Sequence, residues 1–301
     1  MPFVVLSAGQ SGSLSRFTVS SAVMGGPRRI QVYLPASYLE QTNRRYPVLY
    51  LQDGQNVFSS AGRYAGFGWG DWELDKTADK LSRSNRMPEI IMVAVDNSTN
   101  RLYEYSGNLE PEAGSTNVSA FAKYAAFLVN ELKPRIDREY RTRTNASDTA
   151  TLGSSLGGLC SVALAWYHPD TFGGAASLSG AFQVNHTNFL DKVLKEYHGP
   201  PKPVRIYLDS GVCDFMGGDD GCSLTRQVAD QLRRIGWGTN VDCFVDSKPM
   251  TPAELEASGL PQGKWAEAQK SQHNEFYWRM RAWRPLTFLF LLETNALPVT
   301  R

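Results

Sequence analysis

The segment that most constrains the fold lies near the middle of the chain, at residues 149–166. A β-prone run ends at Gly153, and a good helix former begins after Ser155. Residues 153–157 read G-S-S-L-G, the spacing G-x-S-x-G, which between a strand and a helix holds the central serine on a tight, strained turn. The turn leaves almost no room for side chains two positions before and after the serine. The segment therefore predicts a strand, a sharp turn and a helix whose N-terminus lies close behind the Ser155 hydroxyl.

Strand-like and helix-like segments alternate along the rest of the chain. Apolar and β-branched runs predict strands at 16–21, 28–34, 46–51, 89–96, 149–153, 173–180, 204–211 and 241–245. Helical periodicity predicts helices at 71–81, 117–136, 156–166, 189–197, 223–235 and 275–294. The first two strands flank a Gly-Gly-Pro turn and read as an antiparallel hairpin at a sheet edge. The pattern predicts a single α/β domain over residues 1–301, with a mostly parallel sheet covered by helices on both faces.

Composition limits the kinds of binding partner and the cellular location to be expected for this chain. The 301 residues carry a formal net charge of +1, which favours neither a nucleic acid nor an anionic membrane. No apolar run approaches the roughly 18 residues of a membrane span. The N-terminus lacks the basic start and long apolar stretch of a signal peptide, so the expected location is the cytoplasm. Of the four cysteines, Cys213 and Cys222 flank a Gly/Asp-rich loop, where they either bridge or stay free; no zinc-ligand spacing is present.

A nucleophilic serine needs a base, and the chain offers only four histidines. In α/β hydrolases the order along the chain is serine, acid, histidine. His168 ends the predicted helix after Ser155, where it caps the helix, while His186 and His198 precede any plausible acid. His273 follows the last predicted strand and is the preferred base, which would take the Ser155 proton and pass it to the leaving alcohol.

The acid that orients this histidine should follow the strand at 204–211. Asp214 is the preferred candidate, because it occupies the loop position where such an acid usually falls. Asp219 and Asp220 lie in the same loop and remain alternatives, whereas Asp209 is within the strand. For each of them the competing interpretation is a solvated turn carboxylate.

Two main-chain N–H groups should stabilise the oxyanion of the tetrahedral intermediate. One belongs to Leu156, directly after the serine, and the other to the loop after the strand at 46–51, where Gln55 is the preferred residue. This chemistry requires neither a metal ion nor an organic cofactor.

The chain resembles an esterase family that includes enterochelin (siderophore), feruloyl and acetyl-xylan esterases, S-formylglutathione hydrolase and mycolyltransferases. The motifs that carry the resemblance are R-I-Q-V-Y-L-P at 29–35, Y-P-V-L-Y-L-Q-D-G-Q-N-V-F at 46–58, V-D-N at 95–97, N-R-L-Y-E-Y-S at 100–106, G-S-S-L-G-G at 153–158, H-P at 168–169, F-G at 172–173 and H-N-E-F-Y-W at 273–278. The resemblance spans about residues 20–292. It implies an α/β-hydrolase fold and supports Ser155 and His273.

The activity expected from these observations is hydrolysis of a carboxylic ester through an acyl-enzyme. The substrate class is a small-molecule ester or a carbohydrate or siderophore ester. An acyltransferase that uses the same residues with another alcohol as acceptor is the alternative. A binding protein that kept the fold without the chemistry is a third hypothesis, disfavoured by the complete order of serine, acid and histidine.

Loops near the site are expected to select the ester. Trp69 and Trp72, with Phe67 and Tyr64, are candidates for an aromatic wall, with ordinary loop packing as the competing interpretation. Arg101 is a candidate for binding a polar or anionic substrate group. For Arg101 the competing interpretation, which is favoured, is a salt bridge with Glu104. The segment 248–264 lies between the last predicted strand and His273, and it is expected to form either a mobile flap or a surface excursion.

Overall fold

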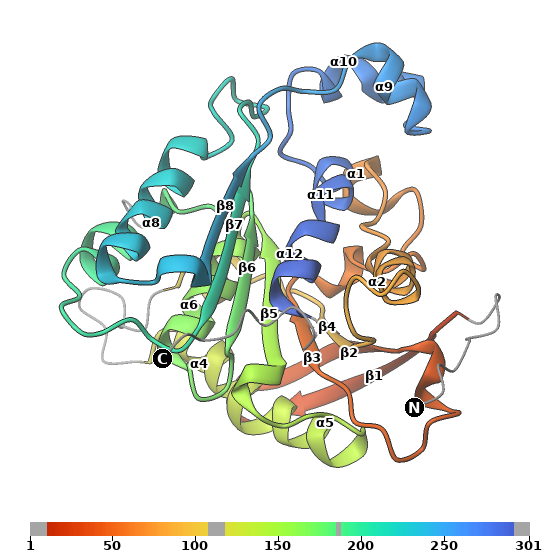
Figure 1. Ribbon diagram of the computed structural model, residues 1–301, viewed down its shortest axis with the longest axis vertical. Coiled ribbons are helices and arrows are strands. Elements are labelled where there is room, and N and C mark those ends of the chain that lie inside the picture. Colours follow the sequence, from red (N-terminus) through yellow and green to blue (C-terminus); the bar gives the residue numbers. More distant parts are fainter. Residues whose placement is uncertain (1–10, 108–117, 185–187, 292–301) are drawn as a thin grey trace.

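The computed structural model describes residues 11–107, 118–184 and 188–291. Its strands form one sheet in the order β1-β2-β4-β3-β5-β6-β7-β8 (Figure 1). They are β1 (Ser13–Ser21), β2 (Gly26–Leu34), β3 (Val48–Leu51), β4 (Ile91–Val95), β5 (Thr149–Ser154), β6 (Gly174–Leu178), β7 (Arg205–Ser210) and β8 (Val241–Val245). The β1–β2 hairpin and the β2–β4 pair are antiparallel, and all other neighbours are parallel. The predicted sheet and N-terminal hairpin are confirmed.

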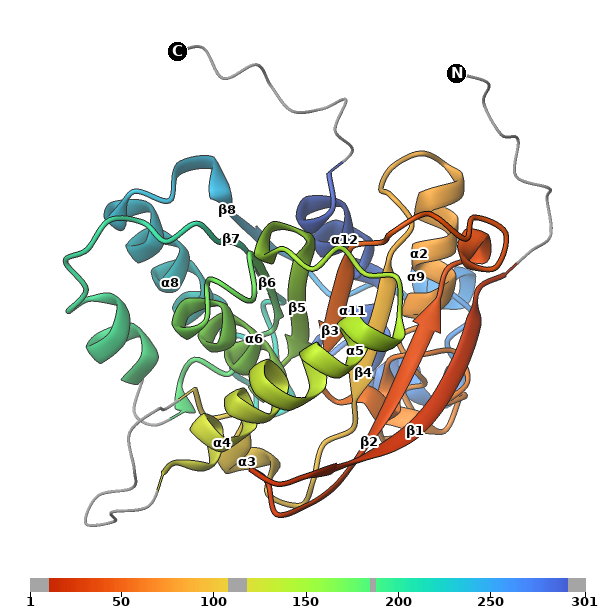
Figure 2. The same ribbon diagram turned by 90° about the horizontal axis from the view of Figure 1, so that it is seen from below.

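Helices cover both faces of this sheet. Those described are α1 (Ala65–Gly68), α2 (Leu74–Arg83), α3 (Arg101–Glu104), α4 (Ala120–Ala126), α5 (Lys133–Glu139), α6 (Leu156–Tyr167), α8 (Cys222–Ile235), α9 (Pro252–Ala257), α10 (Trp265–Ala268), α11 (Glu275–Arg281) and α12 (Trp283–Leu289). Figure 2 shows α4, α5, α6 and α8 on one side of the sheet, with α2, α11 and α12 on the other. Among these described helices, none combines the length and apolar character that a membrane crossing requires.

Strand β3 illustrates why the buried strands are apolar throughout. Val48 and Tyr50 point to the core beneath α4, α5, α6 and α8. Leu49 and Leu51, between and after them, join the second core beneath α2, α11 and α12. Because successive side chains of a strand face opposite sides, a strand covered on both faces must be apolar at every position.

Three predicted helices differ from the structure. The described part of 117–136, from residue 118 onward, contains α4, a π-helical stretch (Phe127–Leu132) and α5. The helix predicted at 189–197 is a π-helical stretch (Phe189–Leu194). The final helix, predicted at 275–294, is divided at Ala282 into α11 and α12, and its residues 292–294 lie outside the described residues. Pro285 supplies the physical reason, since it has no N–H to donate to the carbonyl four residues earlier and its ring crowds that carbonyl.

The turn between β5 and α6 depends on glycine. Ser155 has φ 54° and ψ −124°, a conformation outside the regions that L-residues ordinarily occupy. A Cβ on Gly153 would lie 2.5 Å from the Gly157 carbonyl oxygen, and one on Gly158 would lie 2.4 Å from Ser177 Oγ. Gly153 is therefore a steric requirement of this turn, as predicted. At Gly157, the other predicted position, a Cβ would lie 3.0 Å from Gln52 Cβ, and the tight contact at Gly158 was not predicted.

We expect Gly153→Ala to lower the free energy of unfolding by about 1–3 kcal/mol, because the added methyl group overpacks a site enclosed by main chain. Gly26→Ala is the matched control, since a Cβ there has no atom within 4 Å, and its effect should stay within about 0.5 kcal/mol. Urea unfolding followed by circular dichroism measures both. Equal unfolding midpoints for the two variants would contradict the steric argument.

Candidate active site

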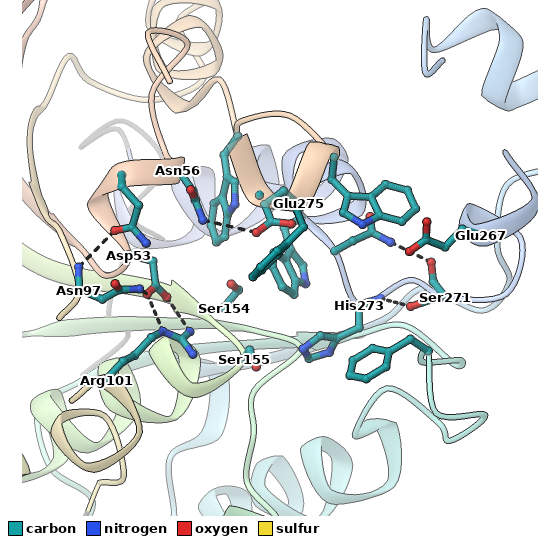
Figure 3. Close-up of a pocket in the computed structure, with 18 residues that line it drawn as sticks. Asp53, Asn56, Asn97, Arg101, Ser154, Ser155, Glu267, Ser271, His273 and Glu275 are labelled. Atoms are coloured by element: carbon teal, nitrogen blue, oxygen red, sulfur yellow. Dashed lines mark hydrogen bonds and ion pairs between the residues drawn. The ribbon is translucent and has the colours of Figure 1, made fainter. Parts of the chain in front are cut away.

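A cavity of about 680 Å³ opens at the carboxyl ends of the parallel strands, where ligand sites of such sheets lie. Ser155 and His273 both line it, although they are 118 positions apart in the sequence. Figure 3 shows the two side chains on neighbouring parts of its wall. The fold thus brings the predicted nucleophile and the predicted base to one cavity.

The strained Ser155 is held by the main chain of its neighbours. Its N–H donates to the Leu178 carbonyl oxygen at 2.9 Å, and its own carbonyl oxygen accepts from the Ala181 N–H at 2.9 Å. Helix α6 begins at the next residue, Leu156, so the positive end of the helix dipole lies beside the hydroxyl. The end of β6 therefore fixes the turn that presents this serine to the cavity.

His273 is paired with Asp220. Its Nδ1 lies 2.6 Å from Asp220 Oδ1, and the Asp220 side chain is fully buried. A carboxylate only accepts hydrogen bonds, so the pairing favours the tautomer with the proton on Nδ1 and leaves Nε2 as an acceptor. The rings of Trp278 and Phe215 pack edge-on against the imidazole, with centroids 5.1 and 6.0 Å away.

Asp220 is itself anchored. Its second oxygen, Oδ2, accepts from Ser179 Oγ at 2.7 Å and from the Gly211 N–H at 2.5 Å. Ser179 Oγ in turn accepts from Trp278 Nε1 and from Arg281, both at 3.0 Å. This carboxylate is therefore oriented from the ends of β6 and β7 and from α11 together.

Asp214, the acid preferred from the sequence, does not contact His273 but binds main-chain N–H groups of its own loop. Asp214 Oδ1 accepts from the N–H groups of Met216 and Gly218 at 2.8 and 2.7 Å, so it closes a turn within its own loop. Asp219 Oδ2 accepts from the Ser223 N–H at 2.9 Å, at the start of α8. Choosing Asp214 as the partner of His273 was therefore wrong, because the loop folds back on that carboxylate and only Asp220 reaches the imidazole.

His168, His198 and the four cysteines do not line the described cavity. His168 is at the C-terminal end of α6, and burial lowers its pKa. His198 is exposed, and His186 lies outside the described residues. Cys213 and Cys222 are free thiols, so the bridge considered across the loop is not formed.

Of the two residues predicted to supply oxyanion donors, one follows Ser155 in the chain and the other lines the same cavity. Leu156 is the first residue of α6, and Gln55 lies in the short turn Gly54–Asn56 after β3 and lines the cavity. Within the described ranges, the main-chain N–H groups of Gln55 and Leu156 have no hydrogen-bond partner. Both N–H groups are thus free to donate to a substrate oxygen.

Arg101 pairs with a different carboxylate from the one favoured. Its Nε and Nη2 donate to Asp53 Oδ1 and Oδ2 at 2.6 and 2.7 Å. Glu104 is instead bound by Arg28, at 2.8 and 3.0 Å, in a pair that is almost fully buried. The favoured Arg101–Glu104 salt bridge was wrong, although Arg101 does line the cavity.

The aromatic loop contributes two different kinds of side chain. Trp69 and Trp72 line the cavity but are buried; Trp72 packs against Trp278, with centroids 5.7 Å apart. Phe67 also lines the cavity and is 94% exposed, whereas Tyr64 is exposed and not part of the lining. An aromatic wall is therefore present, formed by the tryptophans with Phe67 at its edge.

The segment 248–264 packs beside this wall. Leu255 of α9 and Leu260 share a small apolar cluster with Trp69. The Lys264 ammonium lies 4.5 Å from the centroid of the Trp69 ring, a cation–π contact. The segment thus has apolar contacts of its own beside the cavity.

Several residues of the cavity escaped the sequence analysis. Asn56, Asn97 and Glu275 face the same space as Ser155 (Figure 3). Glu275 Oε1 accepts from Asn56 Nδ2 at 3.5 Å, and burial raises the pKa of the Glu275 carboxyl. The sequence signal for all three was the family resemblance, since Asn56 lies in the motif at 46–58, Asn97 in the motif at 95–97 and Glu275 in the motif at 273–278, but no role was assigned to them.

Sequence comparison identifies curated relatives of this chain. The chain is 27% identical over 180 residues to an endo-1,4-beta-xylanase/feruloyl esterase of Xylanibacter ruminicola, covering 56% of this chain and 22% of that protein. The chain spans less than two thirds of the length of the curated relatives it matches.

Two solved structures share the fold. A ferulic acid esterase superposes with a TM-score of 0.66 at 18% identity, covering 94% of this chain and 99% of that one. The enterobactin esterase FES from Shigella flexneri, crystallised in the presence of enterobactin, gives a TM-score of 0.67 at 18% identity, covering 94% and 61%. At this identity the likeness establishes the α/β-hydrolase fold.

The family assignment rests on a longer match. Residues 21–276 match the sequence family described as "Putative esterase", which agrees with the resemblance noted in the motifs. The match includes the turn at Ser155, the loop carrying Asp220, and His273. The chain belongs to this esterase family.

Proposed function

We propose that this protein hydrolyses carboxylic esters through an acyl-enzyme, with Ser155 as nucleophile, His273 as general base and acid, and Asp220 as the residue that orients the histidine. The observation that carries the proposal is the 2.6 Å contact between His273 Nδ1 and Asp220 Oδ1, made by a histidine that shares a cavity with a strained serine. Asp220 takes the role first given to Asp214.

The chemistry follows from these positions. As Ser155 Oγ attacks the ester carbonyl carbon, its proton passes to Nε2 of His273. The buried carboxylate of Asp220 stabilises the imidazolium, which then protonates the departing alcohol. In the second half-reaction His273 takes a proton from water as the water oxygen attacks the acyl carbon, and passes it to Ser155 Oγ as the bond between Ser155 and the acyl group breaks and the acid leaves. The complete cycle returns Ser155, His273 and Asp220 to their starting protonation state.

The carbonyl oxygen becomes negatively charged in both tetrahedral intermediates. The N–H groups of Leu156 and Gln55 are proposed as its donors, and the N-terminus of α6 adds a favourable field. Because both donors are main chain, changing the Leu156 or Gln55 side chain would not test them directly.

The cavity favours an ester with an aromatic or hydroxylated part. Trp69, Trp72 and Phe67 offer flat apolar surface, while Glu275 and Asn56 offer hydrogen-bond acceptors and donors. Among similar proteins are a feruloyl esterase and an enterobactin esterase, so the substrate class is proposed as a small-molecule ester or a carbohydrate or siderophore ester. Turnover across acetyl, feruloyl, acetyl-xylan and siderophore-lactone esters tests it, and added acceptor alcohols reveal any acyl transfer.

Exposure to a fluorophosphonate should add one covalent group to Ser155, because such probes react with an activated serine. Ser155→Ala should remove the adduct and lower p-nitrophenyl butyrate hydrolysis by about 10⁴-fold or more. Peptide mapping by mass spectrometry and a spectrophotometric rate measure these outcomes. A wild-type protein that forms no adduct, or a variant that keeps it, would sink the nucleophile assignment.

We expect Asp220→Asn to reduce kcat by about 10²–10⁴-fold, because the amide no longer stabilises the imidazolium or selects its tautomer. Asp214→Asn is the matched control, since Asp214 is a carboxylate of the same loop that also accepts main-chain hydrogen bonds. Its kcat should stay within a few-fold of wild type, and thermal unfolding verifies that both variants fold. A larger loss in the Asp214 variant would return the role of acid to Asp214.

A further inference from the structure

The turn that carries Gln55 is preceded by a residue in an unusual conformation. Asp53 has φ 56° and ψ 47°, a left-handed conformation that costs a non-glycine residue energy. Its carboxylate accepts from Nε and Nη2 of Arg101 in a two-pronged pair and from Asn97 Nδ2 at 2.6 Å. The left-handed residue is thus restrained through its side chain.

The same turn is also held by contacts to its main chain and to the Gln55 side chain. Gln31 Nε2 donates to the Gly54 carbonyl oxygen at 2.8 Å, from strand β2. The Asn97 N–H donates to Gln55 Oε1 at 3.2 Å, from the end of β4. The residue that carries the proposed oxyanion donor is therefore flanked by contacts from β2 and from the end of β4.

The Asp53 carboxylate also touches the turn of the nucleophile. A Cβ placed on Gly157 would lie 3.1 Å from Asp53 Oδ2. Because Asp53 lines the same cavity as Ser155, its carboxylate, if unpaired, would repel the negative charge that develops on the substrate oxygen. The guanidinium of Arg101 offsets that charge while it holds the carboxylate in place (Figure 3).

Arg101 is built for this contact. Its side chain is 28% exposed, and its guanidinium lies 5.3 Å from the centroid of the buried Tyr105 ring. Stacking and a two-pronged pair together fix a planar group, as a lysine ammonium cannot. The guanidinium donors Nε and Nη2 both point to the Asp53 carboxylate. A side chain held in this way is not free to move toward a substrate.

We infer that Arg101 is a positioning residue: by clamping Asp53 it sets the Gly54–Asn56 turn, so that the Gln55 N–H meets the oxyanion. The inference rests on the proposed function, because the position of the Gln55 N–H matters for catalysis only if an oxyanion forms beside it. It replaces the hypothesis that Arg101 binds a polar or anionic group of the substrate.

The test uses p-nitrophenyl acetate, a neutral ester that has no anionic group for an arginine to bind. We expect Arg101→Ala to lower kcat by about 10–100-fold, part of the roughly 100–1000-fold lost with a whole oxyanion donor, and to change KM by less than about 3-fold. Arg101→Lys should recover part of kcat, because it restores charge without the fork. Added guanidinium ion should raise kcat of Arg101→Ala and leave wild type unchanged.

Arg135→Ala is the matched control. Arg135 Nε also pairs with a carboxylate, Glu139 Oε1 at 2.9 Å, and its guanidinium lies 4.5 Å from the centroid of the Phe17 ring, but it is on α5 and does not line the cavity. Its kcat should match wild type. If Arg101→Ala does not fold, Arg101→Lys and Asp53→Asn carry the test, each with lowered kcat and nearly unchanged KM.

Two results would overturn the inference. One is an unchanged kcat on p-nitrophenyl acetate for Arg101→Ala or, if that variant does not fold, for both Arg101→Lys and Asp53→Asn. The other is a loss confined to KM on esters that carry an anionic group. Fluorophosphonate labelling of wild-type Ser155 separates the two proposals: without an adduct the proposed function fails, whereas with an adduct and unaltered arginine variants only the clamp fails.

Discussion

The site depends on one backbone constraint, the sharp turn at Ser155 between β5 and α6. Its φ of 54° and ψ of −124° are unfavourable for a serine, so the surroundings must enforce them. Two hydrogen bonds to the end of β6 do so, and the glycines at 153 and 158 leave the space that the close approach requires. The parallel pairing of β5 with β6 thus supports both the fold and the presentation of the hydroxyl.

Behind His273, a buried polar network supports the imidazole. Arg281 of α11 is 4% exposed, donates to Ser179 Oγ and pairs with the fully buried Asp209 at 3.2 Å. Burial raises the pKa of the Asp209 carboxyl, and the Arg281 guanidinium opposes that rise. Buried ion pairs add little net stability but fix geometry, because any other arrangement leaves a charge unpaired. Here the fixed geometry reaches Asp220 through the Ser179 hydroxyl.

On the other side of Ser155, charge pairing restrains the turn after β3. Asp53 and Arg101 come from loops that follow adjacent parallel strands, β3 and β4, and meet at the carboxyl edge of the sheet. The two halves of the site therefore follow one pattern: a carboxylate next to the reacting groups is held by side chains from another strand end. That pattern lets loops of little regular structure carry groups whose positions must be accurate.

The sequence alone determined the parts that local patterns express. Apolar runs predicted the strands, and the glycine spacing predicted the turn at Ser155. Of the four histidines, only His273 follows both the serine and a plausible acid along the chain. Tertiary structure decided the partners of the charged groups, because pairing joins residues far apart in sequence. Asp220 reaches His273 across 53 positions, and Arg101 reaches Asp53 across 48. Three aspartates within seven residues look alike in sequence; only the folded loop separates Asp220, aimed at the imidazole, from Asp214, which binds its own main chain.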